Sequence, residues 1–265
     1  MELPYDPLGV LQTNGIAFID LVRSHDHDVS IPSCPGWTIG SIADHQADVW
    51  TFWSRVVADG ITGRGALQSI EAPTGLTGDL LLDWLSASHN ALYSALADAP
   101  PDQQVWSWAG SDLDVSWVRR RMVHESSVHL WDLANAVGDP YEIPVEVAAD
   151  GIDEFLMHFM GRTRGEGEMK VGGTVHLHCT DTTTAASNTS DTDAADPVGE
   201  WFVSSVKEPN CTFTREHRKG DAAVRGRAHD LLLWLWRRNG EKPSGVEIIG
   251  NDVVARRFRA YSDLG

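Results

Sequence analysis

The sequence is poor in cysteine, and this scarcity excludes two common kinds of small stabilised domain. Its 265 residues include three cysteines, Cys34, Cys179 and Cys211. They are odd in number and far apart, and no CxxC pair occurs. Neither a disulfide framework nor a cysteine-rich structural zinc site is therefore predicted. We expect a protein of the reducing cytoplasm.

Basic residues and long apolar runs are also scarce. Lys and Arg number 21 against 38 Asp and Glu, which gives a formal net charge of −17. Such a chain is a poor partner for nucleic acid or an anionic membrane, because both attract clustered Lys and Arg. No apolar run reaches the length of a membrane span, and the opening MELPYDPLGV lacks the basic and apolar regions of a signal peptide. We expect neither a nucleic-acid nor a membrane partner.

The chain does contain enough apolar sequence for a full core. The hydrophobic fraction is 42%, which is ordinary for a globular protein, and the length allows one large domain or two smaller ones. Up to about residue 165 the apolar residues recur with a helical period. Helices are expected over about 8–24, 38–58, from 77 to beyond Leu96, 115–137 and 145–162. Four long amphipathic helices joined by loops predict a bundle.

After about Gly172 the pattern changes to that of a sheet. TVHLHCTD alternates as a strand does, and WFVSSV, CTFTREH, AAVRG and VEIIG read as four more strands. Helices are predicted over Arg227–Arg238 and from Asp252. The polar stretch from about 182 to 198 is expected to be a mobile loop.

The predicted fold class is therefore α+β with two domains. The first, residues 1–165, is a four-helix bundle. The second, residues 166–265, is a smaller α+β domain with a mostly antiparallel sheet.

Three residues interrupt apolar helical stripes with groups that can bind a metal: His45, Glu125 and His129. The first stripe reads Ile42, His45, Val49, Phe52, Val56, and the second reads Val118, Met122, Glu125, His129, Leu133, Ala136. Steps of three and four place each set on one helix face. Burying a carboxylate is costly unless it is paired or metal-bound. Two imidazoles and one carboxylate that face inward form the ligand set of a metal site with an open position.

The same three residues are also compatible with a core that holds no metal. Glu125 and His129 can form a buried hydrogen bond by themselves, and an isolated His45 would be a core histidine with a hydrogen-bond partner. The combination of three such residues on two stripes favours the metal. Zinc is the default, although imidazole ligands also suit nickel, copper and iron. His124 points about a hundred degrees away around the helix and should face elsewhere.

Several neighbouring residues have both a functional and a structural interpretation. His89, between Leu85 and Leu92, is a candidate for cofactor or substrate contact, or a core histidine. Asp132 is a candidate hydrogen-bond acceptor for His129, or a solvated helix residue. The run Arg119–Arg121 is predicted to be an exposed helix face, with a grip on an acidic ligand as the alternative.

His176, His178 and Cys34 also have two interpretations each. The two histidines share one strand face, where they can chelate a metal, but solvent-facing positions are favoured. Cys34 is predicted to be a packed small residue rather than a reactive thiol, since no base stands beside it in the sequence.

Three segments of the chain resemble a known family. SCPGWTIGSIADH and RRRMVHESSVHLWD resemble the two metal motifs of the mycothiol-dependent maleylpyruvate isomerases, which are DinB-like metal-binding helical bundles. VRGRAHDLLLWLWRRNG resembles their sterol-carrier-like C-terminal domain. The resemblance covers nearly the whole chain and assigns the metal ligands to His45, Glu125 and His129. It also implies a functional arginine, best matched by Arg238 with Arg237 one position away.

The resemblance implies an enzyme that uses mycothiol. The thiol sulfur would bind the metal and attack a small electrophile, so that the enzyme acts as an isomerase or an S-transferase. Arg238 would hold a substrate carboxylate or a developing enolate. Gln46 and Leu130 depart from the family pattern, as does the polar loop at about 182–198. These departures weaken the case for maleylpyruvate itself as the substrate.

Two functions of different classes remain as alternatives. One is a metal-dependent hydrolase that uses metal-bound water, and the other is a non-enzymatic small-molecule binding protein. The expected partners are a small substrate and a low-molecular-weight thiol, and the expected assembly is a monomer or homodimer.

Overall fold

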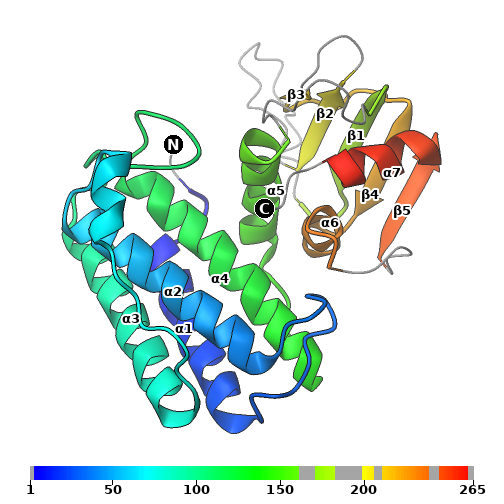
Figure 1. The fold of residues 1–265 in the computed structure, drawn as a ribbon. Coiled ribbons are helices and arrows are strands. Elements are labelled where there is room, and N and C mark those ends of the chain that lie inside the picture. Colours follow the sequence, from blue (N-terminus) through cyan, green and yellow to red (C-terminus); the bar gives the residue numbers. More distant parts are fainter. Residues whose placement is uncertain (1–2, 161–170, 183–198, 206–210, 239–244, 262–265) are drawn as a thin grey trace. The chain divides into compact units, whose positions relative to one another are not determined.

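The computed structural model describes residues 3–160, 171–182, 199–205, 211–238 and 245–261. The chain divides into two compact units, Met1–Ile143 and Pro144–Gly265 (Figure 1). The predicted boundary at residue 165 falls later than this division. The difference is helix α5 (Val145–His158), which packs on α6 (Ala228–Leu235) of the second unit.

The first unit is the predicted helical bundle. It contains α1 (Pro7–Ser24), α2 (Ile39–Ala58), α3 (Gly78–Asp98) and α4 (Val115–Val137), with a short 3₁₀ helix, η1, at Arg64–Ser69. Helix α2 packs mainly on α3, and α1 mainly on α4 (Figure 1). The four helices expected from the apolar period are confirmed.

Capping residues explain where α2 and α4 begin and end. Thr38 accepts a hydrogen bond from the Ser41 amide and completes a capping box before α2. Asp114 accepts from the Trp117 amide before α4. Gly138 ends α4 in the left-handed region at φ 73°, a conformation that favours glycine. The observed bounds of α2 and α4 agree with the helices predicted over about 38–58 and 115–137.

Helix α4 is buried on more than one face, and this corrects one prediction. The sequence predicts an exposed run at Arg119–Arg121, but Arg120 and Arg121 are only 5% and 4% exposed. Arg119 donates to the carbonyl oxygens of Leu96 and Ala99, each 3.0 Å away, where α3 ends. A guanidinium there satisfies carbonyls that the last turn of a helix leaves without partners.

The second unit contains a five-stranded sheet in the order β3-β2-β1-β4-β5. The strands are β1 (Thr174–Cys179), β2 (Glu200–Ser204), β3 (Thr212–Thr214), β4 (Ala222–Gly226) and β5 (Val246–Gly250). Strands β1 and β4 are parallel, and the other three pairings are antiparallel. The predicted mostly antiparallel sheet is thus confirmed.

The two faces of this sheet differ in chemistry. Val175, Leu177 and Val224 are fully buried on the face that packs beneath α6 and α7 (Asp252–Tyr261). His176 and His178 alternate with them and so point to the opposite face. The prediction that both histidines face solvent is wrong for His176, which is 7% exposed.

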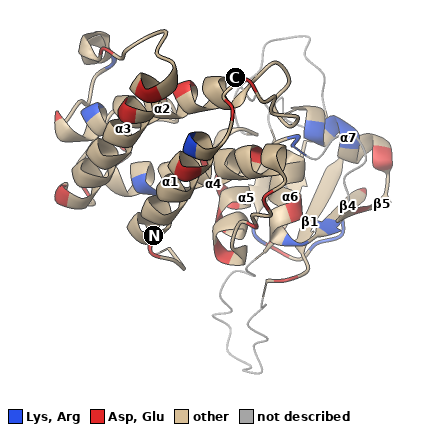
Figure 2. Ribbon diagram, turned by 90° about the horizontal axis from the view of Figure 1, so that it is seen from below, with Lys and Arg blue, Asp and Glu red and all other residues tan. Residues whose placement is uncertain are grey.

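Charge is distributed unevenly over the elements. Asp and Glu are scattered over both units, whereas arginines gather on α7 (Figure 2). Among the described helices, none is long and apolar enough to cross a membrane. The polar loop predicted at about 182–198 lies almost entirely outside the described residues, which resume at Gly199.

Candidate metal centre

The three residues singled out by the apolar stripes converge in the bundle. His45 comes from α2, and Glu125 and His129 come from α4. The Oε1 atom of Glu125 lies 3.3 Å from Nε2 of His45 and 3.3 Å from Nε2 of His129. One ligand atom from each residue lies within 4.8 Å of the other two. Ligands of a tetrahedral zinc at its usual bond lengths are about 3.3 Å apart, so this donor set fits such an ion.

Asp132 fixes the orientation of His129. Its Oδ2 atom lies 3.0 Å from Nδ1 of His129, which leaves Nε2 directed at Glu125. Ser33 donates to Oδ1 of Asp132 at 2.6 Å, and the Cys34 thiol donates to Oδ2 at 3.4 Å. A carboxylate behind a histidine ligand sets its tautomer and ring orientation. Of the two interpretations of Asp132, the structure supports the hydrogen-bond acceptor. The prediction that Cys34 is a packed residue is confirmed by its burial.

Arg121 orients Glu125, and the sequence interpretation missed this role. Its guanidinium donates to Oε2 of Glu125 one helical turn away, so that Oε1 stays directed at the two imidazoles. Arg121 is buried, and a buried guanidinium needs such a partner. The spacing of four residues was a signal for this pair.

The electrostatics of the trio are those of a preformed ion-binding cluster. Burial alone would raise the pKa of Glu125, but Arg121 and the hydrogen bonds from His129 and His45 hold it well below its usual range. Burial likewise opposes the charged form of His129, but Asp132 and Glu125 raise its pKa to about 9. Without a metal, His129 is therefore protonated at neutral pH. A metal that binds there takes the place of that proton.

A pocket of about 420 Å³ adjoins the trio on the His45 side. Its lining residues include Trp37, Trp84, Asp44 and Asp48. The Trp37 ring centre lies 5.0 Å from that of His45 and 6.1 Å from that of His129. Trp37 and His45 both line this pocket, so an indole ring and a candidate ligand lie side by side on its wall.

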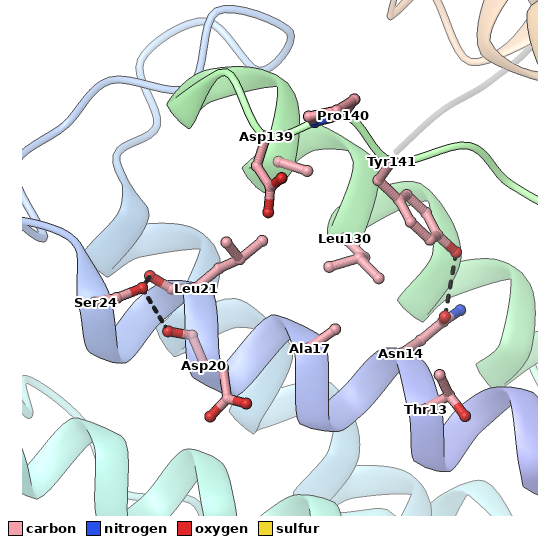
Figure 3. Close-up of a pocket in the computed structure, with 11 residues that line it drawn as sticks. Thr13, Asn14, Ala17, Asp20, Leu21, Ser24, Leu130, Asp139, Pro140 and Tyr141 are labelled. Atoms are coloured by element: carbon pink, nitrogen blue, oxygen red, sulfur yellow. Dashed lines mark hydrogen bonds between the residues drawn. The ribbon is translucent and has the colours of Figure 1, made fainter.

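A second pocket in the same unit lies between α1 and α4 and contains none of the three ligands (Figure 3). It measures about 410 Å³, and Leu130, Leu21 and Tyr141 are among its lining residues. Tyr141 donates to Oδ1 of Asn14 at 3.2 Å. Burial raises the pKa of this phenol to about 12, so it stays neutral and supplies a hydrogen bond rather than a charge.

Two more histidines of the bundle, His124 and His89, lie apart from the trio. His124 faces away, with Nε2 3.2 Å from the Tyr5 hydroxyl, as expected. His89 packs against Trp50 at a ring separation of 4.9 Å, and its Nε2 lies 3.4 Å from the Leu11 carbonyl. Burial lowers the pKa of His89. A cofactor contact for His89 stays a prediction, and these contacts support the core histidine that the sequence also allowed.

The two candidate arginines follow α6 in the second unit. Arg237 has φ 61°, and its amide and that of Arg238 bond back to Trp234 and Leu233. This hydrogen-bond pattern is a Schellman cap. The Arg237 guanidinium donates to the carbonyls of Arg259 and Ala260, where α7 ends. Arg237 therefore has a structural role, and Arg238 remains the candidate for function.

Fold and site together define a two-domain α+β protein whose helical bundle contains a His–Glu–His cluster beside a pocket. Residues 11–134 match the mycothiol maleylpyruvate isomerase N-terminal domain, and residues 146–255 match the C-terminal domain of that family. The chain belongs to the mycothiol maleylpyruvate isomerase family. A comparison with curated protein sequences finds no match.

Two solved structures share the fold. One is a mycothiol-dependent maleylpyruvate isomerase, with a TM-score of 0.55 at 14% identity. The other is a histidine-to-alanine mutant of a mycothiol-dependent maleylpyruvate isomerase, with a TM-score of 0.56 at 13% identity. Each alignment covers 92% of this chain and 91% of the other.

Proposed function

We propose that this chain is a metal-dependent enzyme that uses mycothiol and acts on a small electrophile as an isomerase or an S-transferase. The observation that carries the proposal is the convergence of His45, Glu125 and His129 beside a pocket. Three protein ligands leave a coordination position for a further ligand. A divalent metal such as zinc, with nickel or iron as alternatives, would lower the pKa of a thiol in that position and keep it as a thiolate at neutral pH.

The chain's own residues orient the ligands around this position. Arg121 and Asp132 fix two of the ligands from behind, and both are buried. Trp37 places an apolar ring against the two histidine rings. Asp44 and Asp48 offer acceptors on the pocket wall, and these suit the hydroxyl-rich sugar body of mycothiol.

The reaction needs an electrophilic carbon within reach of the sulfur. In an isomerisation, the sulfur bonds to one carbon of a conjugated double bond, the remaining single bond rotates, and elimination releases the thiol unchanged. In a transfer, the carbon–sulfur bond persists in the product. Arg238 is our candidate for holding a substrate carboxylate. None of the three cysteines forms a disulfide in the described structure, which supports our proposal of a reducing, cytoplasmic setting.

The test combines metal analysis with thiol binding. We expect stoichiometric metal in the purified protein and a rise in Tm with mycothiol that exceeds the rise with glutathione or with the mycothiol analogue whose thiol is a hydroxyl. The thiol-specific rise should vanish in His45→Ala and persist in His25→Ala, an exposed control. Turnover of maleylpyruvate and of thiol-reactive electrophiles then separates isomerisation from transfer. Absence of stoichiometric metal, or equal responses to the thiol and its hydroxyl analogue, contradicts the proposal.

A further inference from the structure

A second cluster of metal-ligating side chains lies on the sheet of the second unit. It consists of His176 and His178 from β1, Glu200 from β2 and His217 from the segment between β3 and β4. One candidate ligand atom from each residue lies within 4.8 Å of the other three. None of these residues belongs to the bundle that contains His45.

Strand pairing brings the first three residues together. His178 lies directly opposite Glu200 in the antiparallel pairing of β1 and β2, and opposite residues project on the same face. His176 is two residues earlier on β1 and therefore shares that face. Nε2 of His176 lies 3.0 Å from Oε2 of Glu200, and Nδ1 of His178 lies 3.2 Å from Oε1.

The segment after β3 adds the fourth residue. Nδ1 of His217 contacts Oε2 of Glu200, and the rings of His217 and His176 are 4.9 Å apart. Contacts on both sides hold this segment in place. Arg215 makes two hydrogen bonds of 2.7 Å to Asp153, and the Arg218 guanidinium lies 4.3 Å from the Phe202 ring centre.

The charge balance around Glu200 argues for a cation. Glu200 is 5% exposed, and its partners among the described residues are imidazoles, with no Lys or Arg ion pair. Nδ1 of His178 is buried and makes no hydrogen bond in the described structure, although it lies 3.2 Å from Oε1 of Glu200. A buried carboxylate needs a compensating charge. A divalent ion would supply this positive charge and would be bound by Nδ1 of His178.

We propose that His176, His178, Glu200 and His217 form a second binding site for a divalent transition metal, independent of the trio in the bundle. Three imidazoles and one carboxylate are four ligands, which complete a tetrahedral coordination, as in structural zinc sites. The ion would join the segment 215–220 to β1 and β2. The imidazole-rich donor set selects zinc, nickel or copper over calcium and magnesium, which take oxygen ligands.

His217 offers the cleanest test, because its side chain is 73% exposed and its replacement should leave the fold intact. The full-length chain, stripped of metal with a chelator, is titrated with zinc in competition with a chromophoric chelator. We expect His217→Ala to bind one ion fewer than the unaltered chain, or to bind that ion at least about tenfold more weakly, since even outer-shell partners of metal ligands are worth about 10–100-fold. His25→Ala, which removes another exposed histidine, should retain the full number.

The comparison is repeated in the His45→Ala, His129→Ala background. There we expect one remaining zinc ion, lost on adding His217→Ala. Cobalt(II) in its place should show the visible bands of a four-coordinate ion, and these should disappear with the same change. If His217→Ala binds as many zinc ions as tightly as its parent, the site does not exist. If the double variant binds no zinc, the cluster is a His–Glu hydrogen-bond network only. Either result leaves the proposed function of the bundle untouched.

Discussion

Arg121 and Glu125 form an ion pair one helical turn apart, on the same helix that supplies His129. The pair leaves Oε2 of Glu125 engaged and Oε1 directed at the two histidines. The Arg121 guanidinium thus orients the Glu125 carboxylate, as Asp132 orients the His129 imidazole. Both supporting contacts come from α4 itself, so this helix contains two ligands and the groups that orient them.

Replacement of Arg121 by Met should destabilise the metal-free protein. The change leaves a mostly buried carboxylate without its cation, a loss of roughly 3–5 kcal/mol for a broken buried pair. Urea denaturation with and without zinc measures it, and bound zinc should recover part of the loss. Arg55→Met, which removes an exposed pair with Asp59, is the control and should cost at most about 1 kcal/mol. Equal losses in the two variants would contradict a special role for Arg121.

Asp132→Asn should weaken metal binding without removing a ligand. Asparagine keeps the shape but loses the charge that fixes the His129 tautomer, so we expect zinc affinity to fall by about 10–100-fold. Competition with a chromophoric chelator gives the dissociation constant. Asp20→Asn, at an exposed position on α1, should leave it unchanged. An unaltered affinity in Asp132→Asn would mean that the hydrogen bond at 3.0 Å does not tune the site.

Metal affinity should rise with pH. In the metal-free protein the pKa of His129 is raised from 6.5 to about 9. Its proton therefore stabilises the fold fully below pH 6.5, and this contribution is lost as the pH rises through about 9. Between these values zinc displaces one proton, so its apparent affinity should rise by about tenfold per pH unit and level off above the pKa. Calorimetry in buffers of different ionisation enthalpy counts the released proton. A flat profile would show that His129 is neutral before the metal binds.

Gln46→Met should stabilise the protein. Gln46 is fully buried, and neither Nε2 nor Oε1 of its amide has a hydrogen-bond partner in the described structure. An unsatisfied buried polar group costs about 1–3 kcal/mol, and methionine of similar size removes that cost. The free energy of unfolding from urea titration should increase accordingly. Gln12→Met, at an exposed position on α1, should change it by less than about 0.5 kcal/mol. A loss of stability in Gln46→Met would indicate an internal water on the amide.

Substitution of the two arginines after α6 should affect different properties, turnover for Arg238 and stability for Arg237. Arg238→Ala should lower turnover and leave metal content and stability near those of the parent. Arg237→Ala should lower stability, because it removes the donors to the last carbonyls of α7. Steady-state kinetics, metal analysis and thermal denaturation of both variants provide the comparison. Unchanged turnover in Arg238→Ala would show that the functional arginine lies elsewhere.

The helices and the trio could be predicted from sequence because both depend on local spacing. The apolar period defines one face of α2, and a ligand that interrupts it must point inward. The same logic failed for Arg120 and Arg121, since α4 is covered on several sides and no single polar face remains. The predicted boundary also assigned α5 to the first domain, whereas this helix packs on α6 of the second unit. A helical period does not reveal which partner a helix packs against.

The second histidine cluster shows another limit of local reasoning. His176 and His178 are visible in the sequence as a pair on one strand face, but Glu200 and His217 join them through strand pairing and a connecting segment. The residues in these contacts are far apart in the sequence, and no local periodicity predicts such contacts. The interpretation of the pair as solvent-facing rests on only half of the cluster.

The separation of the bundle ligands along the chain has a consequence for folding. His45 and Glu125 are 80 residues apart in sequence, on helices that the chain must bring together before any ion can bind both. An ion that bridges them closes a long loop and removes many extended arrangements from the unfolded ensemble. The metal would therefore act as a removable cross-link. The metal-bound bundle should unfold in a single cooperative transition, and a chelator should restore the conformational entropy of the unfolded chain.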